Sequence, residues 1–355
     1  KSLGNGIDPL EVIDKYGADT LRFTLSTGNA PGNDMRFYWE KVEASRNFAN
    51  KIWNASRFVM MNLDGFEPDK IDIGELSLKD SWILKRLNDL TREVTDSLDK
   101  FEIGIAAQKI YDFFWSEFCD WYIEMAKIDL YGDCDSCKRR TQKVLWTVLE
   151  QALKLLHPFM PFITEEIWQH IPHEGKSIMR SPWPQYKEEW DFADTAQMEL
   201  IMDAVRGIRN IRAEMNVPPG KKALSIARVS SPEVMNILKS NLDIIYTLAK
   251  VSEMKLIDES SPIPEKAISC VIKGAEIYLP MEGLVDLDTE IARLKKEKAN
   301  LEKEIDRVNK KLSNQGFLQK APQEVVEKEQ QKQKDYVEML KKVEERLKMM
   351  TDLAK

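Results

Sequence analysis

Residues 284–316 read LVDLDTEIARLKKEKANLEKEIDRVNKKLSNQG and decide the fold of the C-terminal part of the chain. From Leu284 to Leu312, apolar side chains recur at alternating spacings of three and four, with Lys298 as the single polar member. This spacing is typical of the seam of a coiled-coil helix. The sequence SNQG at 313–316 interrupts the seam, so the helix is expected to end there.

A second seam follows the interruption and continues to Met350. If the chain folds back at Gly316, the apolar positions of the two helices face each other, and Lys298 faces the polar Gln333. The two seams therefore predict an antiparallel coiled-coil hairpin over residues 283–355.

The residues before the hairpin divide into three parts. Residues 1–35 are rich in turn formers and contain two short helical patterns, at 9–16 and 18–26. Residues 36–217 predict a helical bundle, because apolar residues recur at helical spacing near 40–62, 77–99, 103–128, 139–156, 162–171 and 194–215. Residues 218–282 follow a Pro-Pro-Gly break and predict a small α/β module, with strand-like runs near 223–228, 254–257, 268–273 and 275–280. The predicted fold class is mainly α.

Bulk composition restricts the classes of function. No apolar run approaches the ~18 residues of a membrane-spanning helix, so no membrane partner is expected. The net charge of −7 argues against nucleic-acid binding on average, since phosphate contacts need Lys and Arg. The hairpin departs from this average, with 17 Lys and Arg against 15 Asp and Glu. A cationic surface can therefore exist on an acidic chain.

The side chains that could carry chemistry do not form a self-contained active site. No glycine-rich phosphate loop precedes a helix, and the three histidines lie near prolines, where capping or packing explains them. Cys134 and Cys137 form the one C-x-x-C pair, and no second pair completes a zinc site, so no metal is expected. Reduced surface thiols in a cytosolic protein are the favoured interpretation of this pair, and a structural metal or redox role is the alternative.

Several motifs resemble those of class I aminoacyl-tRNA synthetases. KSLGN at 1–5 resembles the second half of their K-M-S-K-S-x-G-N signature, and GADTLRF at 17–23 resembles a stretch of the valine, isoleucine and leucine branch. Four stretches resemble the valyl-tRNA synthetases in particular: APGNDMRF at 30–37, RNFANKIWN at 46–54, LHPFMPF at 156–162 and RNIRAEM at 209–215. The closing hairpin also separates these from isoleucyl enzymes, many of which end in a cysteine-rich zinc module.

The resemblance implies an activity for the intact protein. Such an enzyme joins valine to its tRNA with ATP and magnesium, through valyl-adenylate. In the family, the lysine at the position of Lys1 helps neutralise the ATP phosphates, beside the serine at the position of Ser2. The chain is expected to start inside this motif, so residues 1–35 would be the tail of a catalytic domain. The chain by itself is expected to hold no cofactor and to be catalytically inactive.

The same resemblance assigns residues 36–217 to anticodon binding. Asn50, Asn54, Arg57 and Phe58 fall at i, i+4, i+7 and i+8, so they share one face of a helix. Amides and a guanidinium can pair with base edges, and an aromatic ring can stack on an unpaired base. Taken alone, this helix face favours a structural interpretation in which Phe58 belongs to the core and the amides are solvated. The family resemblance favours contact between these side chains and the anticodon.

The hairpin is implied to be a tRNA-binding arm. Lys303, Arg307, Lys310 and Lys311 concentrate positive charge toward its turn. Such residues on a coiled coil are usually a solvated surface. In the family, however, this arm lies against the outer corner of the L-shaped tRNA, which favours contacts with the RNA backbone.

Valine tRNA is therefore the expected partner, with no DNA partner, and two alternatives stay open. One is a fragment of an isoleucyl- or leucyl-type synthetase. The other is a helical adaptor whose coiled coil binds protein partners. The two helices of the hairpin bury their apolar seams against each other within one chain. This argues against the adaptor hypothesis and predicts a monomer.

Overall fold

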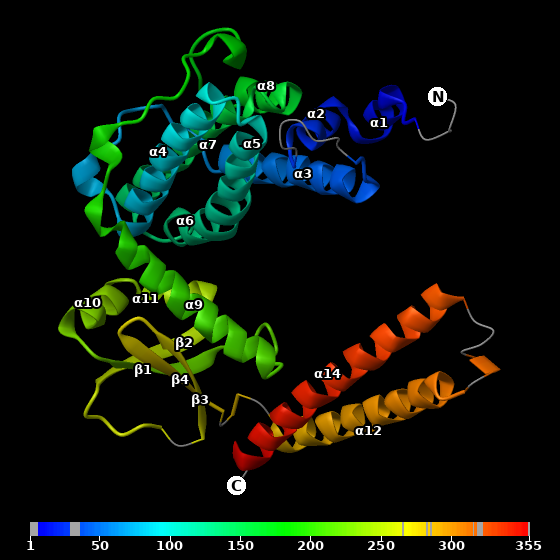
Figure 1. Ribbon diagram of the computed structural model, residues 1–355. Helices are drawn as coiled ribbons and strands as arrows, with labels where there is room; N and C mark the ends of the chain where they lie inside the picture. The colour runs from blue at the N-terminus through cyan, green and yellow to red at the C-terminus, as the bar shows by residue number, and fades with distance from the viewer. Residues whose placement is uncertain are drawn as a thin grey trace. The chain divides into compact units, whose positions relative to one another are not determined.

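The computed structural model describes residues 6–28, 36–264, 266–281, 283–284, 286–314, 316–317 and 322–353. The chain falls into two compact units, Lys1–Met202 and Asp203–Lys355. The first unit is helical, and the second contains a four-stranded sheet and a helical hairpin (Figure 1). The predicted fold class, mainly α with a small α/β module, is confirmed. No helix in the described ranges is long and apolar enough to cross a membrane.

Two short helices open the first unit where the sequence predicts them. Helix α1 (Pro9–Tyr16) begins after Asp8, whose carboxylate accepts a hydrogen bond from the Leu10 amide at 2.9 Å. Gly17, with φ of 91°, separates α1 from α2 (Ala18–Ser26), a conformation that glycine adopts without steric cost. Val12, Leu21 and Val42 form an apolar cluster that holds these helices to the next one.

The bundle of the first unit consists of long helices around an aromatic core. They are α3 (Trp39–Met61), α4 (Leu78–Asp99), α5 (Ile103–Asp112), α6 (Ile123–Leu130), α7 (Asp135–Leu156) and α8 (Pro161–Gln169). The π-helical segment η2 (Phe113–Tyr122) joins α5 to α6 without a break, so one helical stretch covers the predicted 103–128. Its side chains Phe114, Phe118 and Tyr122 are buried, which places this aromatic run in the core. Short 3-10 turns complete the unit: η1 (Ile73–Glu75), η3 (Ile178–Arg180), η4 (Glu188–Trp190) and η5 (Ala193–Thr195).

A mixed sheet forms the α/β module. After α9 (Ala196–Glu214) come β1 (Ala223–Val229), α10 (Pro232–Ser240), α11 (Leu242–Leu248), β2 (Val251–Asp258), β3 (Ala267–Ile272) and β4 (Ala275–Pro280). The strand order is β2-β1-β4-β3, with β1 and β2 parallel and the other neighbouring pairs antiparallel. The parallel pair needs a crossover connection, which α10 and α11 supply.

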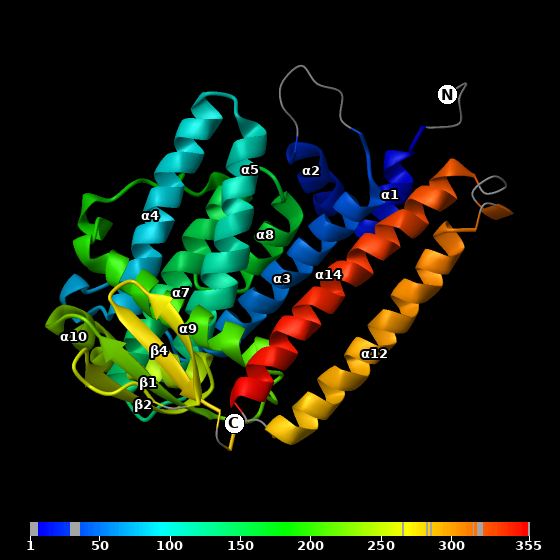
Figure 2. The same ribbon diagram turned by 60° about the horizontal axis from the view of Figure 1, so that its bottom comes forward.

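Helices α12 (Leu287–Leu312) and α14 (Gln323–Leu353) form the predicted antiparallel hairpin and lie side by side in both ribbon views (Figures 1 and 2). The predicted register is wrong. Lys298 pairs with Glu344 at 2.6 Å, and Gln333 donates a hydrogen bond to Asn309 at 2.5 Å, so Lys298 does not face Gln333. Helix α12 ends at Leu312 and α14 begins at Gln323, and the pairs that join them place α14 in a different register from the one that the apolar spacing predicts.

The prediction of reduced thiols at Cys134 and Cys137 is also wrong, because the two sulfur atoms form a disulfide. Cys134 is the N-cap residue of α7, and Cys137 lies in the first turn of that helix. This turn brings the two Cα atoms to 5.3 Å, within the range that a disulfide spans.

Candidate nucleic-acid interface

The residues predicted to contact the anticodon lie together on α3. Asn50, Asn54 and Arg57 are exposed, and Phe58 is half-buried beside them. The face arises because the opposite side of α3 is apolar: Phe48, Ile52 and Val59 are buried in the bundle. Among the described residues, the side chains of Asn50, Asn54 and Arg57 form no hydrogen bond or ion pair. Their donors and acceptors are therefore free to bind a ligand.

Phe58 lies next to a cation from another helix. The Lys127 ammonium, on α6, lies 5.6 Å from the centroid of the Phe58 ring. Lys127 also forms an ion pair with Glu124, at 2.6 Å, in its own helix. An aromatic face with an ammonium beside it can stack on a base while the cation approaches a phosphate. Sequence reasoning missed Lys127, because no local pattern links it to α3.

A second aromatic and cationic pair lies near this face. The Lys51 ammonium is 3.9 Å from the centroid of the Trp115 ring and pairs with Asp120 at 2.6 Å. Trp115 in turn stacks on Tyr111, with ring centroids 5.4 Å apart. Burial, helped by nearby carboxylates, raises the pKa of Tyr111, so the phenol stays neutral. Trp53, which is 37% exposed on α3, adds another aromatic surface.

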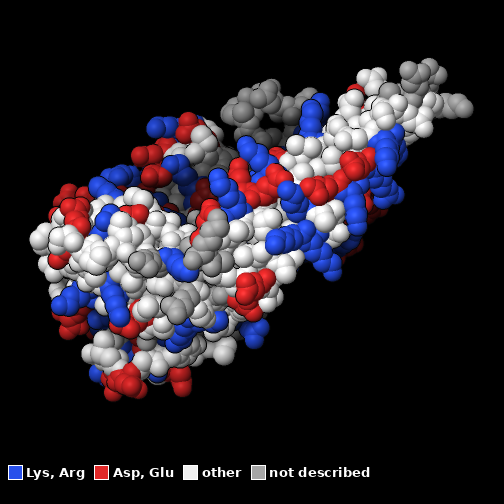
Figure 3. Space-filling view, turned by 90° about the horizontal axis from the view of Figure 1, so that it is seen from below, with Lys and Arg blue, Asp and Glu red and all other residues white. Residues whose placement is uncertain are grey.

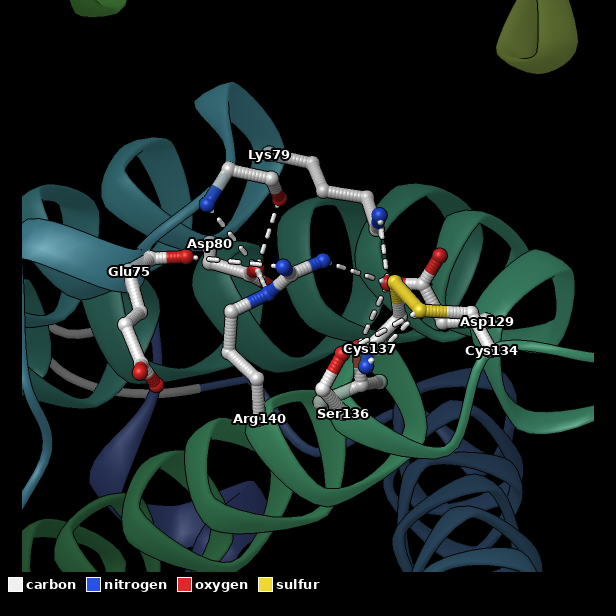
Figure 4. The surroundings of a disulfide bond; sticks show 10 residues. Glu75, Lys79, Asp80, Asp129, Cys134, Ser136, Cys137 and Arg140 are labelled. Atoms are coloured by element: carbon white, nitrogen blue, oxygen red, sulfur yellow. Dashed lines mark hydrogen bonds and ion pairs between the residues drawn. A yellow bond between two sulfur atoms is a disulfide. The ribbon is translucent and has the colours of Figure 1, made fainter.

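A nearly buried network of charges fixes the position of α6. The carboxylate of Asp129, two residues after Lys127, binds Lys79 at 2.8 Å, Arg140 at 3.0 Å and the Thr141 hydroxyl at 2.7 Å. Burial acts to raise the pKa of Asp129, but the two cations and the hydroxyl together lower it, so the carboxylate stays ionised. Because these partners come from α4 and α7, the network ties three helices together (Figure 4).

Asp80 completes this network as a fully buried carboxylate. It accepts hydrogen bonds from Ser77, which begins α4, from the Tyr122 hydroxyl at 2.8 Å and from Arg140 at 2.8 Å. Ser77 and Asp80 thus form a capping box at the start of α4. It also joins the start of α4 to the aromatic core.

The four cations predicted on the arm have different environments. Lys303 and Lys310 are exposed and, within the described part of the chain, have no ion-pair partner. Arg307, with 80% of its side chain exposed, lies 3.7 Å from Glu304, a long distance for an ion pair. Lys311 instead pairs with Glu329 at 2.9 Å. Lys303, Arg307 and Lys310 share one face of α12, at i, i+4 and i+7.

Basic and acidic side chains are interspersed along the arm (Figure 3). On α14, Lys328 pairs with Glu324 at 2.9 Å, and Lys332 pairs with Glu329 at 3.3 Å. These paired cations are less available to a phosphate than those on the free face of α12, because a ligand would have to compete with a carboxylate.

Asp19 and Arg22, which belong to the motif at 17–23, have structural roles. Asp19 accepts hydrogen bonds from the amides of Phe162 and Ile163 at 3.2 and 2.6 Å, which caps the start of α8. Arg22 donates to the carbonyl oxygen of Pro158 at 2.9 Å. Two motifs that are far apart in sequence, 17–23 and 156–162, thus contact each other. Lys1 and Ser2 lie outside the described residues.

The motif at 209–215 lies in α9 and holds that helix to the α/β module. Arg212 is buried and donates hydrogen bonds to the carbonyl oxygens of Lys221 at 2.7 Å and Pro218 at 3.3 Å. Arg209 donates to the carbonyl oxygen of Leu248 at 2.9 Å. These arginines satisfy backbone acceptors at the edges of the module, which is a packing role.

Three protein families match successive parts of the chain. Residues 1–38 match the class I tRNA synthetases of the isoleucine, leucine, methionine and valine group. Residues 80–228 match the anticodon-binding domain of tRNA ligase, and residues 286–351 match the valyl tRNA synthetase tRNA binding arm.

Individual relatives agree with these matches. The chain is 51% identical to a valine–tRNA ligase of Oceanobacillus iheyensis, 49% identical to one of Bacillus subtilis and 53% identical to one of Clostridium acetobutylicum. Each alignment covers 98% of this chain but only 39–40% of the relative. The chain therefore belongs to the valine–tRNA ligase family of class I aminoacyl-tRNA synthetases and corresponds to their C-terminal portion, with an anticodon-binding domain and a tRNA-binding arm.

Proposed function

We propose that the exposed face of α3 binds the anticodon of valine tRNA and that the free cations of α12 bind the RNA backbone at its outer corner. We further propose that the whole protein is a monomeric cytoplasmic enzyme that attaches valine to this tRNA through valyl-adenylate, using ATP and magnesium. Lys1 and Ser2 are the residues proposed to meet the ATP phosphates, on the strength of their motif. The chain alone is proposed to bind tRNA without catalysis.

The anticodon proposal depends on one observation, which is that polar side chains on the exposed face of α3 lack partners. Two amides and a guanidinium are exposed and have no partner among the described residues, although they lie beside the half-buried ring of Phe58. Unpaired bases are recognised by this combination of hydrogen-bonding edges and a stacking surface. The Lys127 ammonium, 5.6 Å from that ring, supplies a positive charge for the adjoining phosphate.

The free cations of α12 support contact with the tRNA backbone. Three of them share one helix face and are weakly paired or unpaired within the described part of the chain. Phosphate contacts position an RNA and carry no sequence information themselves. Sequence preference is therefore assigned to α3 and general affinity to the arm.

Titration of the chain with three RNAs across a salt series tests both assignments. The RNAs are valine tRNA, the same tRNA with a changed anticodon, and isoleucine tRNA. Binding that weakens when the anticodon changes, with a steep salt dependence, supports the proposal. Equal binding to all three RNAs would contradict the role of α3, and no binding to any would favour a helical adaptor.

A further inference from the structure

A pair of cysteines at the start of α7 takes no part in the proposed tRNA contacts. Cys134 is exposed, Cys137 is half-exposed, and a disulfide joins them across the first turn of the helix (Figure 4). Small oxidants and reductants in solution can therefore reach the bond. The other two cysteines, Cys119 and Cys270, are partly buried and free.

The position of Cys134 favours its thiolate once the bond is reduced. Its sulfur accepts a hydrogen bond from the Cys137 amide at 3.2 Å and lies 3.4 Å from the Ser136 hydroxyl. It occupies the N-cap of a 22-residue helix, where unsatisfied amides and the positive end of the helix dipole stabilise an anion. The thiolate is the nucleophile in disulfide exchange, so the same contacts make Cys134 the attacking residue.

The two free cysteines have the opposite environment. Burial raises the pKa of Cys119 to about 12 and, together with the charge of Glu276, raises the pKa of Cys270 to about 11. Both remain protonated near neutral pH and react slowly. The chain therefore contains its own internal comparison between a reactive and an unreactive pair of thiols.

The charge network under the disulfide holds the two sulfur positions close together. Arg140, three residues after Cys137, binds Asp80 at 2.8 Å and Asp129 at 3.0 Å. Thr141 binds Asp129 as well, at 2.7 Å. None of these contacts uses a sulfur atom, so we expect the start of α7 to stay in place when the disulfide opens. The two thiols are then held close together, so the disulfide can form again without a large loss of chain entropy.

We propose that Cys134 and Cys137 form a thiol–disulfide exchange site whose substrates are small disulfides, such as glutathione disulfide, and small dithiols. In the oxidising direction, the Cys134 thiolate attacks glutathione disulfide, forms a mixed disulfide and releases one glutathione thiolate. The Cys137 thiol then loses its proton to solvent and attacks the Cys134 sulfur, which releases the second glutathione thiolate. Two electrons pass from the cysteine pair to one glutathione disulfide, and a dithiol reverses the sequence.

The site is tested by following all four thiols in one experiment. The chain is reduced, desalted, mixed with glutathione disulfide near neutral pH and quenched with a maleimide at intervals, and each cysteine is quantified by peptide mass spectrometry. The expected result is loss of maleimide labelling at Cys134 and Cys137 at least tenfold faster than formation of any glutathione adduct at Cys119 or Cys270. Equal rates at all four cysteines would overturn the proposal.

Three variants separate the two steps. Cys137→Ser is expected to retain a stable glutathione adduct on Cys134, and Cys134→Ser is expected to form an adduct on Cys137 several times more slowly. Arg140→Gln is expected to slow closure of the disulfide without slowing formation of the first adduct. A Cys137→Ser protein that keeps its helical circular dichroism but forms no adduct would refute the assignment of Cys134 as the nucleophile.

Discussion

At the scale of single residues, Phe58 is the side chain on which the anticodon proposal depends most. A base stacked on an aromatic ring contributes about 1–3 kcal/mol, so Phe58→Ala should weaken binding of valine tRNA by roughly 5- to 150-fold. Asn54→Ala, which removes an exposed amide, should reduce discrimination against a changed anticodon. Filter binding or fluorescence titration at constant salt measures both effects.

Phe162 provides a matched control for Phe58. Its side chain is 65% exposed on α8, so Phe162→Ala removes the same ring from a different surface. It should leave tRNA affinity unchanged. Thermal melting must accompany both variants, because Phe58 is half-buried and its loss could loosen α3. A Phe58→Ala protein that melts normally and binds tRNA as tightly as the parent would contradict the stacking role.

Asp129 is a residue on which the stability of the bundle depends. Its carboxylate pairs with Lys79 and with Arg140, which also pairs with Asp80. The site is nearly buried, since the side chain of Lys79 is only 6% exposed. Removing one partner of a buried ion pair costs about 3–5 kcal/mol, because the remaining charge is left uncompensated. Asp129→Asn should lower the free energy of unfolding by that order, measured by denaturant titration followed by tryptophan fluorescence.

The same carboxylate gives the stability of the bundle a dependence on pH. The pKa of Asp129 is lower in the folded state than its ordinary value, so its contribution is fully present above about pH 4 and is lost as the pH falls through the folded-state pKa. Asp129→Asn should therefore flatten the decline of stability in acid. An unchanged acid profile would show that other carboxylates dominate the decline.

At the scale of elements, helix α12 of the arm should control the salt dependence of tRNA binding. Each phosphate contact that is lost reduces the slope of log affinity against log salt by on the order of 0.7–0.9. Replacing Lys303, Arg307 and Lys310 together by Gln should lower the slope by about 2–3. The relative affinities for matched and changed anticodons should stay the same, because these cations are not proposed to contact bases.

A second triple variant on α14 controls for net charge. Lys328, Lys332 and Lys342 each pair with a glutamate at 2.6–3.3 Å, so replacing them by Gln removes the same charge from side chains that are already engaged. The salt slope should then change by less than one. Equal slopes for the two triple variants would mean that overall charge, rather than the α12 face, governs binding.

The apolar repeat of the arm does not determine how its two helices are aligned along each other. A coiled-coil seam repeats every seven residues, so the two helices can slide past each other and still match apolar with apolar. In the observed register Lys298 pairs with Glu344, Gln333 donates to Asn309, and Glu290 pairs with Arg346 at 3.1 Å. Such contacts are polar and far apart in the sequence, and the apolar spacing alone does not reveal them.

At the scale of the whole molecule, the chain spans about 40% of the length of the curated relatives that it matches. Purified alone, it should bind valine tRNA and should give no valine-dependent exchange of pyrophosphate into ATP. The exchange assay detects adenylate formation directly. Detectable exchange by the chain alone would contradict the proposal that it is a binding portion without catalysis.

The sequence by itself determined the order and type of the elements. Apolar spacing located every long helix from α3 to α9 and both helices of the arm, and the short helical patterns at 9–16 and 18–26 match α1 and α2. These signals are local, because periodicity and capping act within a few residues. Motif resemblance, an equally local signal, led to the synthetase family that the comparisons confirm.

Only the tertiary structure decided which distant side chains meet. It brought Lys127 to the ring of Phe58 and gathered Lys79, Asp129 and Arg140 into one network. Each of these contacts depends on the packing of several helices at once, and no spacing within one segment encodes it. The free energy of such contacts is the balance between the cost of desolvating the polar groups and the attraction between them at short distance, and both exist only after the chain has folded.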